Sequence, residues 1–265
     1  MYVKHPVCIT PEDENIKIWR YMDFTKFVSL LEKRSLFFSK AKLLEDPLEG
    51  MYPKPDKQEI ALKAKESLTS QFPNQDLSDD VFNKLLDTTL KTLREFTAIN
   101  SWHINYYESA AMWKLYLQSN EGIAVQSTFK KLTECFRNTE LAIYVGKVNY
   151  LDYETDSLPP SRFEEHKQGG KFLTFLCKRK SFEYESELRA IVEIPLENQK
   201  SNLSDEISSY KGIYVPVDLD NLIETIFVSP TAPRWFKELV ESVLHKYDLT
   251  KTIVEQSNLY SDSVI

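Results

Sequence analysis

Glycine and cysteine are scarce in this sequence. Of its 265 residues, 6 are glycine and 3 are cysteine. Neither GxGxxG nor GxxxxGKS/T occurs, which excludes the phosphate-binding loops of Rossmann domains and of P-loop proteins. The cysteines Cys8, Cys135 and Cys177 are far apart, so the sequence predicts neither a disulfide framework nor a zinc site.

Metal-binding histidine pairs, serine-hydrolase motifs and long apolar runs are also missing. The 4 histidines show no metal-ligand spacing, and neither GxSxG nor HExxH is present. No apolar run approaches the length of a membrane span, and the first residues lack the apolar core of a signal peptide. We therefore expect a cytoplasmic protein with no membrane partner and no metal, whose site residues come from several elements.

Acidic residues outnumber basic ones. The net charge of −7 argues against a nonspecific nucleic-acid binder, because phosphate contacts need clustered lysine and arginine. A local basic groove stays open as an alternative around Lys178, Arg179 and Lys180.

Short strands and helices alternate irregularly along the chain. Alternation predicts strands at 17–22, 35–40, 98–103, 123–127, 141–150, 181–194, 212–217, 222–229 and 252–255. Apolar spacing and caps predict helices at 24–31, 56–72, 78–98, 108–118, 129–137, 161–180 and 233–247, with a loop at 197–210. This order predicts a single α+β domain over 1–265, with a mixed, mostly antiparallel sheet, flanking helices and a helical insertion at 53–98.

The segment 181–194 alternates strictly between charged and other residues. Glu183, Glu185, Glu187 and Arg189 fall on one side of the predicted strand, and mostly apolar residues fall on the other. One interpretation is the solvated outer face of a sheet. The other is a functional carboxylate, since three like charges on one face repel one another and such a cost is typical of active sites.

Three segments, the last of which overlaps 181–194, occur in the same order as the motifs of a known family. They are IWRYMDFTKFVSLLEKRSLFFSKAKLLEDPLEG at 18–50, NSWHINYYESAAMWKLYLQSNEGIAV at 100–125 and KSFEYESELRAIV at 180–192. Together these blocks resemble the bacterial domain-of-unknown-function 2971 family. The sequence departs from that family at Glu45 and Leu48, where the family usually has asparagine and phenylalanine.

This family is distantly similar to the ADP-ribosyltransferase superfamily. The resemblance implies an ADP-ribosyltransferase-like fold and a transferase or glycohydrolase that consumes NAD as its substrate. It also implies a toxin of bacterial antiviral defence or abortive infection. The implied partners are NAD or a related nucleotide, a protein or nucleic-acid acceptor, and other defence proteins.

The superfamily pattern is an early-strand Arg or His, a Ser or Tyr on a second strand and a Glu on a later strand. Arg20, Ser39 and one of Glu185 and Glu187 match it. We expect Glu187 to stabilise an oxocarbenium-like state and Glu185 to position the acceptor, although the two roles are interchangeable. Arg20 would clamp a phosphate or ribose oxygen, and Ser39 would hold the nicotinamide ribose.

Neighbouring residues complete the candidate site. Trp102 is expected to stack on nicotinamide or a base, Tyr21 is placed with it among the nucleotide-binding residues, and His103 is expected to move a proton. Arg189 is either a phosphate contact or the partner that offsets the glutamate repulsion.

Structural roles compete with these functional ones. Arg20 has an alternative as a salt bridge to Glu49 or Glu187. Ser39, a lone strand serine, has one as a merely structural residue, and His103 has one as a hydrogen-bonded structural residue. We expect core packing for the residues Trp113 and Tyr116, and loop capping for Asp46 and Glu49.

Two other function classes stay open. A metal-independent nuclease or other RNA-processing enzyme would use His103 and Glu185 as acid and base, with the basic run at 178–180 on the phosphates. A non-enzymatic module would sense a phage protein or a nucleotide. Nicotinamide release from NAD separates the first reading from both alternatives.

Overall fold

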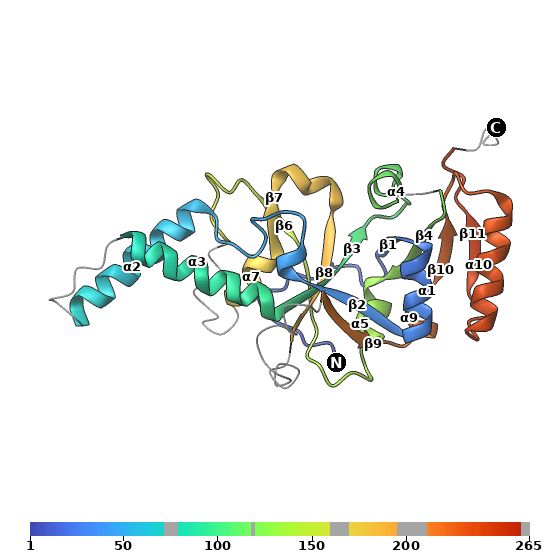
Figure 1. The fold of residues 1–265 in the computed structure, drawn as a ribbon, viewed down its shortest axis with the longest axis horizontal. Coiled ribbons are helices and arrows are strands. Elements are labelled where there is room, and N and C mark those ends of the chain that lie inside the picture. Colours follow the sequence, from blue (N-terminus) through green and yellow to red (C-terminus); the bar gives the residue numbers. More distant parts are fainter. Residues whose placement is uncertain (72–78, 118–119, 160–169, 195–210, 261–265) are drawn as a thin grey trace.

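The structure is a computed structural model that describes residues 1–71, 79–117, 120–159, 170–194 and 211–260 (Figure 1). The strands are β1 (Lys17–Asp23), β2 (Ser35–Lys40), β3 (Thr97–Ile104), β4 (Gly122–Thr128), β5 (Tyr144–Lys147), β6 (Asn149–Leu151), β7 (Cys177–Arg179), β8 (Glu187–Glu193), β9 (Gly212–Pro216), β10 (Thr225–Val228) and β11 (Ile253–Gln256). The helices are α1 (Phe24–Lys33), α2 (Lys54–Gln71), α3 (Asp79–Phe96), α4 (Ala110–Tyr116), α5 (Phe129–Glu134), α7 (Gly170–Leu173), α9 (Leu219–Leu222) and α10 (Arg234–Lys246), with 3-10 turns η1 (Ala41–Leu43), η2 (Thr174–Leu176) and η3 (Lys180–Glu185). The predicted loop at 197–210 lies outside the described residues.

Nine of the described strands form one sheet. Its main path is β11-β10-β4-β1-β3-β2-β9, and β8 pairs with both β3 and β5. In the described part of the chain the pairs of this sheet are antiparallel, except for the parallel pair of β10 and β11. Strands β6 and β7 form a separate parallel pair. The predicted α+β class with a mixed, mostly antiparallel sheet is confirmed.

The two faces of the sheet are covered differently. Alternate residues of β1 and β8, such as Ile18, Met22 and Leu188, face the main core, to which α1, α5 and α10 contribute. On the opposite face, Ile99 and Ile191 pack against residues of α7 and η2 in a smaller cluster. Helices α2 and α3 pack on each other and extend away from the sheet at the left of Figure 1, in the range predicted for a helical insertion.

The first strand and helix follow local sequence signals. Asp23 caps α1, because its side chain accepts a hydrogen bond from the backbone of Lys26. The helix ends at Arg34, whose left-handed φ of 43° reverses the chain into β2. As a result, β1 and β2 both lie beside β3.

The sheet forks where β1 and β2 share one edge of β3. Strand β2 pairs with β3 at Ser39↔Ile99 and Lys40↔Ala98, and β1 pairs with it at Ile18↔Ile104 and Trp19↔His103. Between these contacts, no described strand pairs with residues 100–102 of β3 on this edge, although β8 pairs with them on the other. Side chains of the neighbouring strands can therefore enter the fork.

The predicted strand at 181–194 is wrong in its first half. Residues 180–185 form η3, and Ser186 takes a left-handed φ of 41° before β8 begins at Glu187. Strand β8 is buried on both faces until its last residue. Glu187 and Arg189 do share one side, but it is not a solvated face. Glu183 stays exposed on η3.

Two other predicted elements are divided. The strand predicted at 141–150 is split into β5 and β6 around Val148. The helix predicted at 161–180 lies partly outside the described residues, and from residue 170 onward it is replaced by α7, η2 and β7. The change to an extended strand at Cys177 places Lys178 beside the carboxylates of η3 and β8.

Candidate active site

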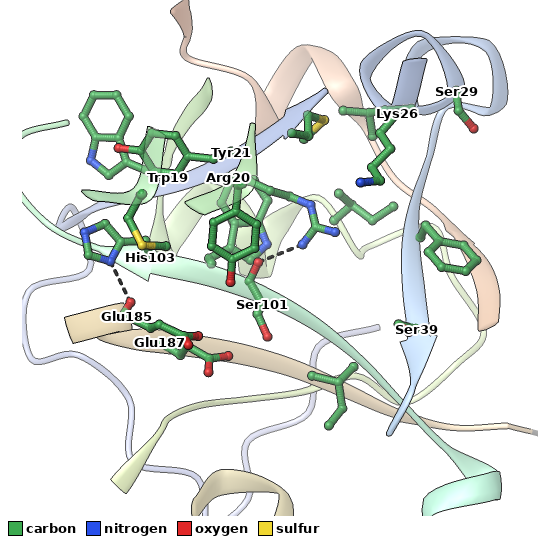
Figure 2. Close-up of a pocket in the computed structure, with 18 of the residues that line it drawn as sticks. Trp19, Arg20, Tyr21, Lys26, Ser29, Ser39, Ser101, His103, Glu185 and Glu187 are labelled. Carbon is green, nitrogen blue, oxygen red and sulfur yellow. Dashed lines mark hydrogen bonds between the residues drawn. The ribbon is translucent and has the colours of Figure 1, made fainter. Parts of the chain in front are cut away.

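A cavity of about 520 Å³ opens at the fork (Figure 2). Its volume lies in the range of small-molecule sites, roughly 300–1,000 Å³. The predicted site residues that line it are Arg20, Tyr21, Ser39, Trp102, His103, Glu185 and Glu187. They come from β1, β2, β3, η3 and β8, so the fold brings together residues from all three sequence blocks.

Arg20 extends from β1 into the fork. Its Nη1 donates a hydrogen bond of 2.7 Å to the carbonyl oxygen of Ser101, one of the residues that β1 and β2 leave unpaired. No carboxylate within ion-pair distance of Arg20 is found in the described part of the chain, so the alternative salt bridge to Glu49 or Glu187 is not formed. Burial lowers the pKa of Arg20 to about 10, which still leaves it charged at neutral pH. An uncompensated guanidinium on a cavity wall favours an anionic ligand.

A buried cluster of charges lies at the other side of the fork. Glu187 accepts hydrogen bonds of 2.8 Å from both Nε and Nη2 of Arg189, and one of 3.0 Å from Lys178. Lys178 also contacts Glu185 at 2.9 Å and Glu49 at 3.4 Å, and Arg189 contacts Glu49 at 2.5 Å. Three carboxylates thus face two cations, which leaves one negative charge when all five groups are ionised.

Gly50 helps to place Glu49 in this cluster. Its φ of +77° suits glycine, and a Cβ at this position would lie 2.5 Å from a ring carbon of Phe175. The predicted turn at Asp46-Pro47 is also present, since Asp46 accepts from the backbone of Leu48. Loop capping is therefore right for Asp46, whereas Glu49 is an ion-pair partner.

The two neighbouring glutamates differ in protonation. Burial and the charge of Glu187 raise the pKa of Glu185 to about 7, against the opposing effect of Lys178. Burial also disfavours ionisation of Glu187, but Arg189 and Lys178 hold the pKa of its carboxyl well below its usual range. The uncompensated charge of the cluster therefore appears and disappears with Glu185.

His103 supports the backbone of this site. Its Nδ1 donates 2.6 Å to the carbonyl oxygen of Glu185, which fixes the tautomer. Nε2 is enclosed and has no hydrogen-bond partner among the described residues. Burial lowers the pKa of His103, so the ring is neutral at pH 7. The structural alternative for His103 matches this geometry, and its proton transfer stays a prediction.

Tyr21 and Ser39 flank the cavity on β1 and β2. The Tyr21 hydroxyl accepts from the backbone of Ser109, and its ring packs edge-on against Trp113. Ser39 is half-buried and faces the cavity from the side of β2. Ser39 can contact a ligand, whereas Tyr21 is 6% exposed and its ring packs in the cluster with Trp19 and Trp113. Both binding roles stay predictions.

Two predicted nucleotide contacts need correction. Arg189 is 1% exposed, does not line the cavity, and its remaining guanidinium nitrogen, Nη1, donates a hydrogen bond to the carbonyl oxygen of Phe175. It is the partner that offsets the glutamate repulsion, and the phosphate-contact role is wrong. Trp102 reaches the cavity wall, but it is 2% exposed, belongs to the main core and donates its indole N–H to Asn100. It offers no free ring for stacking.

The basic run at 178–180 does not form a groove for phosphates. Lys178 is buried among carboxylates, Arg179 pairs with Asp46 at 2.9 Å, and Lys180 pairs with Asp156 at 3.0 Å. All three cations of the run therefore have carboxylate partners, which weakens the case for the phosphate contacts of the nuclease alternative.

Several cavity residues were missed by the sequence reasoning. Tyr116 was assigned to the core but is 44% exposed and lines the cavity, whereas Trp113 is buried as predicted. Other missed wall residues are Lys26, Ser29, Phe37, Ser101 and Tyr214. Alternation on β2 places Phe37 on the same side as Ser39, a signal that was present in the sequence.

The described ranges contain neither a metal-binding cluster nor a membrane-spanning helix. No group of three or more His, Cys, Asp and Glu residues there is placed to hold a metal ion. No helix of the described chain is both long and apolar enough to cross a membrane.

Comparison with solved structures finds a distant likeness in fold. No family model and no curated protein matches the sequence, so the similarity to the domain-of-unknown-function 2971 family stays an interpretation of the three blocks. The fold is similar to that of DarT from Thermus sp. 2.9, solved in complex with ADP-ribosylated single-stranded DNA. The identity is 11%, the likeness covers 94% of this chain and 97% of that chain, and the TM-score is 0.38. Similarity at this level carries no information about what this chain binds.

Proposed function

We propose that the protein cleaves the bond between nicotinamide and ribose in NAD and passes the ADP-ribosyl group to an acceptor. The observation that carries this proposal is the pairing, across one cavity, of an uncompensated guanidinium with a carboxylate cluster that keeps one net negative charge when Glu185 is ionised. NAD has the complementary pattern, since its pyrophosphate is anionic and its nicotinamide ribose becomes cationic during cleavage.

The guanidinium and the glutamate cluster, on opposite sides of the cavity, have different chemical roles. Arg20 binds the pyrophosphate, and Ser101 and Ser39 offer hydroxyls toward the riboses. When the C–N bond breaks, its electron pair goes to the nicotinamide ring, which leaves neutral, and positive charge develops on the ribose. The negative charge of the glutamate cluster stabilises this oxocarbenium-like state.

The structure changes which glutamate we assign to this task. Glu187 was the first choice from sequence, but Arg189 and Lys178 already neutralise its charge. Glu185 has one cationic contact and holds the variable charge. We assign Glu185 to the transition state and to receiving the acceptor's proton, and Glu187 to positioning.

A toxic role in bacterial defence is part of the proposal. It is supported by the resemblance of the three sequence blocks, and water, protein and nucleic acid all remain acceptors to be tested. Growth of cells after induced expression tests toxicity, with the Glu185→Gln variant as the inactive control.

Nicotinamide release by the purified protein tests the proposed reaction. Wild type should release nicotinamide from NAD, and Glu185→Gln should lose on the order of a hundredfold in rate, the scale of losing one preorganised electrostatic contact. Glu183→Gln is the matched control, because Glu183 lies on the same turn but is exposed and outside the cavity lining. NAD binding without any release would leave the nucleotide-sensing alternative in its place.

A further inference from the structure

We infer that the end of the cavity between α1, β2 and β9 is an adenine subsite, in which Phe37 and Tyr214 form a platform for the base. The inference rests on the proposed function for its ligand, since it names where the adenosine half of the dinucleotide lies. It assigns a binding role to Phe37 and Tyr214, which are not among the site residues predicted from the sequence.

The platform is a cross-strand aromatic pair. Phe37 of β2 lies directly opposite Tyr214 of β9 in the antiparallel register, and their ring centroids are 5.1 Å apart. Both rings line the cavity, and Tyr214 is 44% exposed. The two ring planes are inclined at 56°, and Phe37 is half-buried, so it is chiefly the exposed Tyr214 ring that is available to a planar ligand on the cavity wall.

Neighbouring groups hold the platform in place. The ammonium group of Lys33 lies 4.6 Å from the centroid of the Tyr214 ring, and the Tyr214 hydroxyl is 3.3 Å from that of Ser29. Gly212 lies two residues before Tyr214 on the same strand, opposite Ser39. A Cβ at Gly212 would lie 2.0 Å from the carbonyl oxygen of Phe38 and 2.7 Å from the Phe37 ring, so glycine allows β9 to pack this closely.

The positions of the charged side chains along the cavity determine how a bound dinucleotide is oriented. In Figure 2 the guanidinium of Arg20 lies between Glu185 and Glu187 on one side and Lys26 and Ser29 of α1 on the other. A dinucleotide with its pyrophosphate at Arg20 and its reacting ribose at the glutamates therefore directs its second nucleoside toward α1. The aromatic pair lies at that end, and stacking on such rings suits any planar base.

Equilibrium binding of two ligands tests the subsite independently of turnover. ADP-ribose contains the adenosine half, and nicotinamide mononucleotide contains only the other half. We expect Tyr214→Leu to weaken ADP-ribose binding by about tenfold, the lower end of the effect of losing one stacking contact, and to leave nicotinamide mononucleotide binding unchanged. Tyr214→Phe should retain the affinity, because it keeps the ring and loses only the contact with Ser29.

Controls separate a local from a general effect. Trp235→Leu removes an exposed aromatic on α10 that does not line the cavity, and it should change neither affinity. Thermal melts of each variant confirm that the fold is intact. Equal weakening of both ligands by Tyr214→Leu, or undiminished ADP-ribose binding, overturns the adenine subsite.

The same experiment distinguishes this inference from the proposed function. If ADP-ribose binding depends on Tyr214 but NAD releases no nicotinamide, the subsite stands and the reaction falls. If NAD is cleaved and Tyr214→Leu has no effect on ADP-ribose, the reaction stands and the subsite falls. If neither ADP-ribose nor nicotinamide mononucleotide binds, both are overturned.

Discussion

The rate of NAD cleavage should rise with pH through about 7. The charge cluster carries a net negative charge only when Glu185 is ionised, and the pKa of Glu185 is raised to about 7 by burial and by Glu187. A single group with this pKa is about one-tenth ionised at pH 6 and about nine-tenths ionised at pH 8, which predicts a roughly tenfold increase in rate.

The other ionisable side chains around Glu185 keep one protonation state in this range. They are Lys178, Glu187, Tyr116 and Tyr150. Burial raises the pKa of both tyrosines, and nearby glutamates raise it further. The pKa of Lys178 is raised by its carboxylate partners despite burial, and that of Glu187 is held low by its cationic ones. Burial lowers the pKa of His103, which contacts Glu185 only through the main chain.

Initial rates of nicotinamide release between pH 5.5 and 8.5 provide the assay. Glu183→Gln should reproduce the wild-type profile, whereas Glu185→Gln should be slow and lack the rise. A profile that is flat in the wild type, or a rise that persists in Glu185→Gln, would refute the assignment of the variable charge to Glu185.

Four more outcomes follow from the geometry. Glu187→Gln should lower the free energy of unfolding by about 3 kcal/mol or more, because it leaves buried cations without their partner, and a denaturant melt measures this loss; a melt like that of Glu183→Gln would contradict it. Arg20→Gln should raise the KM for NAD by about tenfold or more while changing the melting temperature little, and an unchanged KM would argue against the pyrophosphate contact. The folded-state pKa of Glu185 lies above its unfolded value near 4.5, so this group's contribution to stability is complete below that value and is lost as pH rises through about 7. Chemical melts should show this decrease in wild type and not in Glu185→Gln. Lys180→Ala should leave ADP-ribose binding unchanged, because Lys180 pairs with Asp156 away from the cavity, and weakened binding would restore the basic groove.

Local signals in the sequence were sufficient for the elements that build the fork. Period-two alternation located β1, β2 and β3, and the capping side chain of Asp23 located the start of α1. The order of these elements was enough to predict an α+β sheet protein. Their convergence on one cavity could be anticipated only from the family resemblance, because it depends on long-range pairing.

The charge cluster could not be read from the sequence in the same way. The spacing of Glu183, Glu185 and Glu187 along the sequence is the same whether the segment is one continuous strand or, as observed, a 3-10 turn followed by a strand. The change of direction between the two depends on a single left-handed residue, Ser186. Lys178 has the appearance of a surface basic residue until β7 places it beside Glu185 of η3 and Glu187 at the start of β8. Ion pairing with Glu49 joins distant segments, so no local pattern reveals it.

Crystals of the protein with a non-hydrolysable NAD analogue provide the most direct test of the central claim, that one dinucleotide occupies the fork of the sheet. We expect its pyrophosphate at hydrogen-bond distance from Arg20, its nicotinamide ribose beside Glu185 and its adenine against Tyr214. A ligand bound elsewhere, or bound in the cavity with no phosphate oxygen near Arg20 and no ribose near Glu185, would contradict the claim.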